Sequence, residues 1–295
     1  MIYEKIVEKT LIDKGWSGDK KYRIRTDDGA VYLLRVTSPE RLERAKSQFA
    51  RMQKVANLGI PMCLPMEFGV AAEGPYTIQS WIEGWDAEEA IPSLTPDQQY
   101  AYGLDAGRIL QKIHTLPAPA EITPWAEKFG RKIDRKIVMY ADCPLKYEGG
   151  EAFLRHIEAS RHLLTDRPQC FQHGDYHSGN MMVDSKGVLT IIDFDRDDYG
   201  DPWEEFNRIN WCAQLSPAFA SGLVDGYFDG EVPMDFWQLL ALYLCSNALG
   251  CLPWAIPFGE QEIQVMRRQA ADVLGWYDSF RTVIPGWYQN RGGKK

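Results

Sequence analysis

The sequence lacks most features of a secreted, membrane-anchored or disulfide-bonded protein. Its 295 residues include only six cysteines, and no two of them are spaced as Cys-x-x-Cys. In a chain of this length without an export signal, we interpret the thiols as buried or half-buried side chains. No run of about 18 apolar residues suggests a membrane span, and the N-terminal stretch MIYEKIVEKTLIDKG has no uninterrupted apolar core. We therefore expect a cytoplasmic protein without a membrane partner.

Positive charge is also scarce. Lys and Arg number 33 against 41 Asp and Glu, which gives a net charge of −8. Broad nucleic-acid binding needs a basic stripe, so we expect no nucleic-acid partner, whereas an acidic protein can accept a cationic small molecule. The apolar fraction of 45% is ordinary for a globular protein, and the length favours two lobes. We expect a monomer or a weak dimer.

The first 80 residues predict a small β-rich lobe with one helix. A turn at residues 26–29 contains Gly29 and separates two strand-like runs. A helix then begins near Ser38, a residue suited to capping, shows apolar residues at helical spacing as far as residue 56, and ends before Gly59 and Pro61. The expected strands are 22–25, 31–36, 65–69 and 76–79.

After residue 82 the pattern becomes mainly helical. Thr95 and Pro96 begin one clear helix, and a two-strand insert at 181–183 and 189–192 surrounds a turn at 184–187. The expected helices are 95–114, 125–140, 150–164, 234–250 and 260–280. The fold class is therefore α+β, with an N-terminal lobe and hinge at 1–82 and a larger helical lobe at 83–295. Ligands commonly bind between such lobes.

The residues that carry chemistry form one short pattern. Asp175 and Asn180 are five residues apart, and Asp193 follows the second strand of the insert. A hairpin between Asn180 and Asp193 would return Asp193 to the loop that carries Asp175. Hard cations prefer carboxylate and amide oxygens, and phosphoryl transfer needs a separate carboxylate to orient the attacking hydroxyl. Asn180 and Asp193 therefore suit metal binding, and Asp175 suits the hydroxyl.

The pattern His-Gly-Asp-x-His-x-x-Asn followed by Ile-Asp-Phe-Asp resembles the aminoglycoside phosphotransferase and choline kinase superfamily. Further similarity lies in Gly-Trp-Ser-Gly-Asp at 15–19, Leu-Gln-Lys-Ile-His at 110–114 and Gly-Asp-Pro-Trp at 200–203. The resemblance implies a bilobal protein-kinase-like fold and a kinase that uses Mg²⁺ with ATP or GTP. It assigns Asp175 as the catalytic carboxylate and Asn180 and Asp193 as metal ligands.

The same resemblance implies supporting roles for other residues. Ser17 belongs to the loop that covers the nucleotide, and the segment Gln79, Ser80, Trp81 and Ile82 is the expected hinge to the base. His173, His177, Asp195 and Asp201 are expected to shape or brace the catalytic segments.

One position departs from the family pattern. The family's phosphate-binding lysine is replaced by Arg35, which still carries charge and a bidentate fork. Lys20 or Lys21 is an alternative source of the phosphate contact. Glu43 is the expected helix partner of this cation, with Glu40 one turn away.

The acceptor is less well specified. Asp197, Asp198, Glu204 and Glu205 form an acidic group after the metal segment, which could hold a cationic acceptor such as an aminoglycoside-type antibiotic or could be a solvated helix start. A housekeeping substrate such as choline, an amino alcohol or a sugar is the alternative. The tryptophans at 203, 211, 237 and 254 are interpreted as core residues, of which one or two could line an acceptor pocket.

Other classes of protein fit the sequence less well. His173 and His177 with Asp175 could be a zinc site, but no further His or Cys has supporting spacing. A nucleotide-binding regulatory protein whose activity is spoiled by Arg35 remains an alternative, against which the intact Asp175, Asn180 and Asp193 argue. A protein-substrate kinase is disfavoured because no activation segment follows Asp193.

Overall fold

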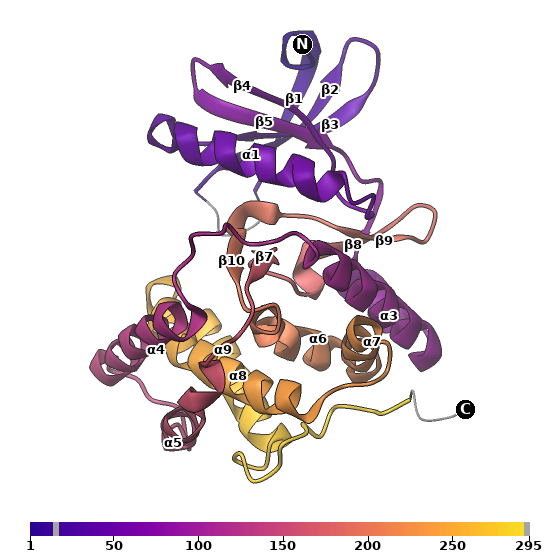
Figure 1. Cartoon of the computed structure of the whole chain (residues 1–295). Coiled ribbons are helices and arrows are strands. Elements are labelled where there is room, and N and C mark those ends of the chain that lie inside the picture. The colour runs from indigo at the N-terminus through magenta and orange to yellow at the C-terminus, as the bar shows by residue number, and fades with distance from the viewer. Residues whose placement is uncertain (14–17, 292–295) are drawn as a thin grey trace. The chain divides into compact units, whose positions relative to one another are not determined.

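Two units make up the chain in the computed structural model, which describes residues 1–13 and 18–291. The first unit contains Met1–Ala90 and Gly179–Asp197, and the second contains Ile91–Ser178 and the chain from Asp198 onward. The first is built on a β-sheet and the second on helices (Figure 1). The α+β class is thus confirmed.

A five-stranded antiparallel sheet forms the body of the first unit. Its strand order is β1-β2-β3-β5-β4. The turn between β2 and β3 has Gly29 at φ 84°, a left-handed conformation that glycine adopts without strain. The sequence analysis missed β1, which forms the edge of the sheet and has mostly exposed side chains. The strands are β1 (Ile6–Ile12), β2 (Lys20–Thr26), β3 (Val31–Val36), β4 (Pro65–Ala71) and β5 (Gly74–Ser80).

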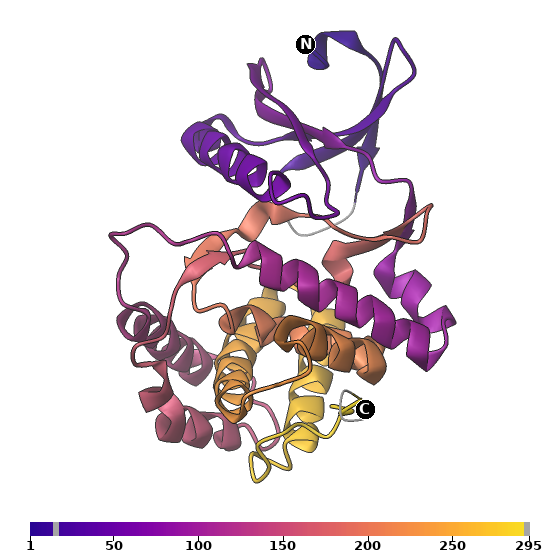
Figure 2. The same ribbon diagram turned by 45° about the vertical axis from the view of Figure 1, so that its right-hand side comes forward.

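Helix α1 (Leu42–Ala56) packs on one face of this sheet, against β4 and β5 (Figures 1 and 2). Its buried residues Ala45, Met52 and Val55 recur at helical spacing, as the sequence predicted. A 3₁₀ turn, Pro39–Arg41, precedes the helix, and the Ser38 side chain makes no capping hydrogen bond to it. The sheet contributes a core of Ile24, Leu34, Val36, Tyr76 and Ile78.

A second, smaller sheet explains why residues 179–197 belong to the first unit. Strand β8 (Met181–Asp184) pairs with β6 (Gly84–Asp86) and with β9 (Leu189–Ile191), and Met62 bridges Ile191. Short helix α2 (Ala87–Ala90) follows β6. A division into consecutive segments of the sequence cannot take account of strand pairs between distant residues. The observed units therefore differ from the expected lobes 1–82 and 83–295.

The second unit consists mainly of helices. Thr95 begins α3 with a capping box, because its side chain accepts from the Gln98 amide while Gln98 accepts from the Thr95 amide. Two short strands, β7 (Cys170–Gln172) and β10 (Asp198–Gly200), pair antiparallel. The helices are α3 (Pro96–Ile113), α4 (Trp125–Asp142), α5 (Glu151–Ser160), α6 (Ile209–Leu215), α7 (Pro217–Phe228), α8 (Met234–Ala255) and α9 (Glu260–Trp276).

Helices α3 and α7 lie side by side with their backbones in close contact (Figures 1 and 2). Glycines on both helices make this approach possible, since a Cβ at Gly107 would lie 2.2 Å from the Leu223 carbonyl oxygen and one at Gly226 would lie 2.2 Å from the Leu104 carbonyl oxygen. The same holds for Gly103 and Gly222. Glycines four residues apart on each helix therefore allow the two backbones to pack in direct contact.

Helix α8 is apolar on all sides. The stretch Met234–Phe258 is long and apolar enough to cross a membrane, but 67% of its most apolar window is buried inside the protein. This corrects the expectation that no such run exists. The burial is typical of the central helix of a globular unit.

Candidate active site

The β8–β9 hairpin positions the predicted metal-binding residues of the first unit. Met181 pairs with Ile191, and the Ile192 amide donates to the Asn180 carbonyl at 3.0 Å, so the two ends of the hairpin meet as predicted. Asp193 follows with φ 63° and ψ 61°. This left-handed conformation is uncommon for a residue with a side chain and is concentrated at functional sites.

Arg35 on β3 is surrounded by three carboxylates of the same unit. Its Nε donates to Asp19 at 2.7 Å, its Nη1 donates to Asp193 at 3.0 Å, and its Nη2 binds Asp195. The arginine is 9% exposed. Burial by itself lowers the pKa of Arg35, but the charges of Asp193, Asp195 and Asp19 outweigh it and leave the pKa above its usual value. Arg35 is therefore permanently charged.

Lys21 supplies a second cation to the same carboxylate. It lies directly opposite Arg35 in the β2–β3 ladder, and its Nζ lies 3.3 Å from Asp193 Oδ2. Arg35 and Lys21, both named as candidates for the phosphate contact, thus reach Asp193 from neighbouring strands. Two cations from neighbouring strands, together with an acidic residue, form an arrangement that can bind polyphosphate.

Helix α1 contributes an amide to this cluster. Gln48 Nε2 donates to the Phe194 carbonyl at 2.7 Å and to Asp195 Oδ1 at 3.1 Å. Glu43 is exposed and, among the described residues, makes no ion pair with Arg35, so the expected pairing is corrected. The reason is local charge: three carboxylates already saturate Arg35, and the helix instead donates to one of them.

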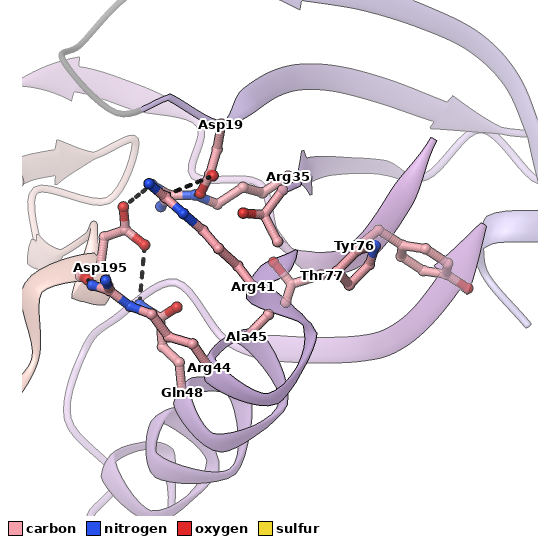
Figure 3. Close-up of a pocket in the computed structure, with 11 residues that line it drawn as sticks. Asp19, Arg35, Arg41, Arg44, Ala45, Gln48, Tyr76, Thr77 and Asp195 are labelled. Carbon is pink, nitrogen blue, oxygen red and sulfur yellow. Dashed lines mark hydrogen bonds and ion pairs between the residues drawn. The ribbon is translucent and has the colours of Figure 1, made fainter. Parts of the chain in front are cut away.

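A small polar hollow adjoins Arg35. It has a volume of about 40 Å³ and is lined by Arg35, Arg41, Arg44, Gln48 and Asp195, among others (Figure 3). Arg44 donates to the Asp195 carbonyl oxygen at 3.3 Å, and Arg41 lies 3.8 Å from Asp19. The Arg44 contact braces the segment after Asp193 against α1.

The donor chemistry of Asn180 and Asp193 fits a hard divalent cation. An amide oxygen and a carboxylate are its preferred ligands, and Mg²⁺ is usually held by one or two carboxylates together with substrate phosphates. No cluster of three or more His, Cys, Asp or Glu side chains suited to a metal occurs in the described part of the chain. The two residues would therefore hold the ion jointly with a phosphorylated ligand.

The predicted hinge follows β5. Gln79 and Ser80 are the last residues of that strand, and the Ser80 hydroxyl accepts from the Leu64 amide at 2.8 Å. Trp81 is half-buried, with the Arg23 guanidinium 5.5 Å from its ring centre, and Ile82 is half-buried beside it. Ser17, the predicted nucleotide-loop residue, lies outside the described residues.

In the second unit, Asp175 is held by a residue that the sequence analysis did not identify. Arg208 Nε lies 2.6 Å from Asp175 Oδ1. His177 Nε2 lies 3.7 Å from the same oxygen, and the His177 ring packs near Trp211 at 6.0 Å between ring centres. Because Arg208 lies 33 positions after Asp175 and outside any recognised motif, only the tertiary structure reveals this pair.

Glu205 fixes the backbone of the loop before Asp175. Its Oε1 accepts from the Gly174 amide at 2.9 Å, and its Oε2 lies 3.7 Å from His114 Nε2. His173 is fully buried, and its Nδ1 accepts from the Asp175 amide at 3.3 Å. Loop conformation is thus set by buried polar contacts, which are costly to leave unsatisfied.

Asp201 stabilises the strand that leads into the loop. It is fully buried and binds Arg167 at 2.6 Å, the Tyr243 hydroxyl at 2.5 Å and the Trp203 amide at 2.9 Å. Its carbonyl oxygen accepts from Gln172 at 2.8 Å, immediately before His173. Asp201 therefore supports the loop through β7 and β10.

The four acidic residues proposed as an acceptor cradle already have partners. Within the second unit, Asp198 binds Lys128 at 2.8 Å and Glu204 binds Lys132 at 2.8 Å, while Glu205 is committed to the Gly174 amide. Asp197, in the first unit, binds Arg51. The structure thus shows neutralised carboxylates in place of an open acidic surface.

Of the four tryptophans interpreted as mainly core residues, Trp203 and Trp211 are half-buried and Trp254 is exposed, so the interpretation is only partly correct. Trp237 is buried in the core, and Trp203 packs edge-on against Phe228 and Phe236. Trp211 lies beside His177 of the loop that carries Asp175.

Comparison with known proteins agrees with this geometry. A family model described as the phosphotransferase enzyme family (APH) matches residues 9–237. No curated protein sequence matches the chain significantly. The match covers the sheet, the Asp175 loop and the Asp193 segment.

Solved structures share the fold at low sequence identity. An aminoglycoside phosphotransferase APH(4)-Ia variant in complex with ADP and hygromycin B is 16% identical, with a TM-score of 0.66 over 93% of this chain and 96% of that chain. Amicoumacin kinase hAmiN with AMP-PNP and Ca²⁺ is 13% identical, with a TM-score of 0.66 over 97% and 92%. A choline/ethanolamine kinase family protein from Mesorhizobium loti is 15% identical, with a TM-score of 0.63 over 92% and 90%.

Proposed function

Because the chain belongs to the phosphotransferase enzyme family, we propose that it transfers the γ-phosphoryl group of ATP or GTP to a hydroxyl of a small molecule. The observation that carries this proposal is the pairing of Asp193, in its left-handed conformation, with Arg35 and Lys21 from adjacent strands. The carboxylate can serve as a metal ligand, and the two cations on neighbouring strands can donate hydrogen bonds to phosphate oxygens.

The donor nucleotide is assigned to the first unit. Asn180 and Asp193 hold Mg²⁺, which supplies charge neutralisation for the phosphates when it is bound. Arg35 and Lys21 then exchange a carboxylate partner for phosphate oxygens. The segment Gln79 to Ile82 meets the base, as the family resemblance implies.

The acceptor hydroxyl is assigned to Asp175. An oriented carboxylate accepts the hydroxyl proton while the oxygen attacks the γ-phosphorus, and most of the rate comes from positioning and charge stabilisation. Transfer requires both residue sets to act on one phosphoryl group. The chain connects them within five residues, from Asp175 to Asn180.

The engaged acidic residues favour a metabolite acceptor over a cationic antibiotic. Asp198 and Glu204 bind lysines, and Glu205 is buried and accepts from the Gly174 amide, so each of the three is already engaged within the protein. We assign the protein to the cytoplasm, where nucleotide and Mg²⁺ are both abundant.

A panel of acceptors tests the proposal. Purified protein is mixed with Mg²⁺, ATP or GTP, and aminoglycosides, amino alcohols, sugars and hydroxy acids, and nucleoside diphosphate release is compared with an acceptor-free control. Transfer to any hydroxyl supports the proposal, and its loss in Asp193→Ala assigns the metal ligand. Thermal stabilisation by ATP and Mg²⁺ without transfer to any acceptor would instead indicate a nucleotide-binding regulatory protein.

A further inference from the structure

Three lysines form a row along α4 of the second unit. Lys128, Lys132 and Lys136 are spaced by four residues and therefore lie on one face of the helix. The first two have acidic partners from residues 198–208, the segment that begins with β10. Lys128 lies 2.8 Å from Asp198, and Lys132 lies 2.8 Å from Glu204. The first two lysines of the row thus pair, in the same chain order, with acids of residues 198–208.

The third position of the row breaks this pairing. Lys136 makes no hydrogen bond or ion pair with any side chain in the described part of the chain, and the segment offers Arg208 in place of a third acid. The pKa of Lys136 is lowered to about 8, mainly by burial and also by the positive charges of Lys132 and Arg208. Cys251 and Glu204 act in the opposite direction. Among the described residues, Lys136 therefore has no carboxylate within ion-pair distance, although the charge of Glu204 still acts on it.

The side-chain stem of Lys136 packs over a glycine of α8. A Cβ at Gly250 on α8 would lie 3.1 Å from Lys136 Cε, so a larger residue there would crowd the lysine stem. Lys136 as a whole residue is half-buried.

Arg208 connects this position to the catalytic carboxylate. Its Nε lies 2.6 Å from Asp175 Oδ1. Lys132 is paired with Glu204 and Arg208 with Asp175, whereas Lys136 has no ion-pair partner among the described residues. An acceptor that needs Asp175 for its hydroxyl must also draw Arg208 away from it.

We propose that the acceptor carries an anionic group, a carboxylate or a phosphate, beside its reacting hydroxyl, and that Lys136 and Arg208 bind this group. The inference rests on the proposed kinase function and names its substrate class. A guanidinium and an ammonium together suit a carboxylate or a phosphate. A cationic acceptor would add charge where positive charge is already in excess.

The anionic group also prepares the reaction. As Arg208 moves to it, the Asp175 carboxylate becomes available to the acceptor hydroxyl. The hydroxyl proton then passes to Asp175, a bond forms between the acceptor oxygen and the γ-phosphorus, and the bond from the γ-phosphorus to the bridging oxygen breaks. That oxygen leaves with the electron pair on the nucleoside diphosphate.

Paired acceptors provide the first test. Phosphoryl transfer is measured with serine against serinamide, glycerate against glycerol, and glucose 6-phosphate against glucose, with kanamycin and choline as cationic acceptors. We expect kcat/KM to be at least about 10-fold higher for the anionic member of one or more pairs. Preference within the first two pairs identifies a carboxylate, and preference within the third identifies a phosphate. Transfer confined to neutral or cationic acceptors overturns the inference and leaves the kinase assignment intact.

Variants provide the second test. Lys136→Gln should raise KM for the preferred acceptor by about 10- to 100-fold with a smaller change in kcat, and Arg208→Lys should retain more activity than Arg208→Gln. Arg135→Gln is the matched control, because Arg135 is the exposed neighbour of Lys136 on the same helix. An unchanged acceptor KM in Lys136→Gln overturns the assignment of Lys136.

A binding measurement keeps the inference testable if no acceptor in the panel reacts. Inorganic phosphate and malonate, compared with chloride at equal ionic strength, should raise the Tm of the wild type and of Arg135→Gln. The same anions should produce a smaller rise in Lys136→Gln. Equal anion stabilisation of all three proteins counts against the site whether or not the kinase proposal holds.

Discussion

Lys21 and Arg35 face each other across β2 and β3, and both reach the carboxylate of Asp193. The position that the family fills with lysine is thus served here by an arginine with a lysine beside it. Arg35 also binds Asp19 and Asp195, so it is at once a phosphate-binding candidate and the organiser of a buried ionic cluster.

Removal of Arg35 should therefore affect both stability and nucleotide binding. Arg35→Met leaves the carboxylates of Asp19, Asp193 and Asp195 close together without their common cation, and we expect a loss of about 3–5 kcal/mol in the free energy of unfolding. Denaturant unfolding measures this change. Arg35→Lys should lose less, and a wild-type stability for Arg35→Met would contradict the central role of this arginine.

Asp175→Asn should separate chemistry from nucleotide binding. The variant keeps the size of the side chain but cannot accept the hydroxyl proton, so we expect turnover to fall by about 10²- to 10⁴-fold. Nucleotide affinity, measured by titration with ATP and Mg²⁺, should change little because the assigned phosphate ligands are elsewhere. Near-normal turnover would remove Asp175 from the catalytic role.

Glu205 is predicted to act through loop position. Glu205→Ala removes the acceptor of the Gly174 amide and should lower kcat by about 10-fold or more, whereas Glu205→Gln keeps an oxygen acceptor and should recover much of the activity. If Glu205 instead bound a cationic acceptor, the two variants would raise the acceptor KM alike. Comparison of kcat and KM in both variants distinguishes these roles.

Lys136 predicts a specific dependence of stability on pH. Its pKa is lowered to about 8 in the folded protein and is near 10.4 in an unfolded chain, so between these values the unfolded state binds more protons and stability rises with pH. Below pH 8 Lys136 is charged in the folded protein, and burial of this charge lowers the free energy of unfolding by its full amount. Lys136→Met should therefore be more stable than the wild type at pH 7, by about 1–3 kcal/mol.

The difference between Lys136→Met and the wild type should shrink as the pH rises from 8 to 10. Urea unfolding at several pH values measures it. A constant difference across this range would show that the lysine is not held in a charge-poor environment.

The α3–α7 contact predicts an asymmetry between glycines. Gly107→Ala would place a Cβ within 2.2 Å of a backbone oxygen of α7 and force the helices apart, so we expect a loss of more than about 2 kcal/mol. Gly130→Ala, on α4 with no atom within 4 Å of the added carbon, is the matched control and should be neutral or stabilising by up to about 1 kcal/mol. Thermal unfolding compares the two, and equal effects would argue against close packing.

Several features of the fold could be predicted from local sequence alone. The Thr95 cap, the turn at Gly29 and the hairpin that returns Asp193 depend on neighbouring residues, and the structure contains all three. Edge strand β1 was missed because its exposed side chains give no alternating apolar pattern. The membership of residues 179–197 in the first unit depends on pairing with β6, which no local signal reports.

The sequence by itself determined the chemical character of the site, because the spacing of Asp175, Asn180 and Asp193 is a local property of one loop and one hairpin. Only the tertiary structure decided what each charge meets. Glu43 points to solvent although its position suggested a partner, and Glu204 meets Lys132 although its neighbours suggested an open acidic surface. Arg208 reaches Asp175, while Lys136 forms no ion pair within residues 1–13 and 18–291. Charge partners come from segments far apart in the chain, so their pairing is set by packing and cannot be inferred from residue spacing.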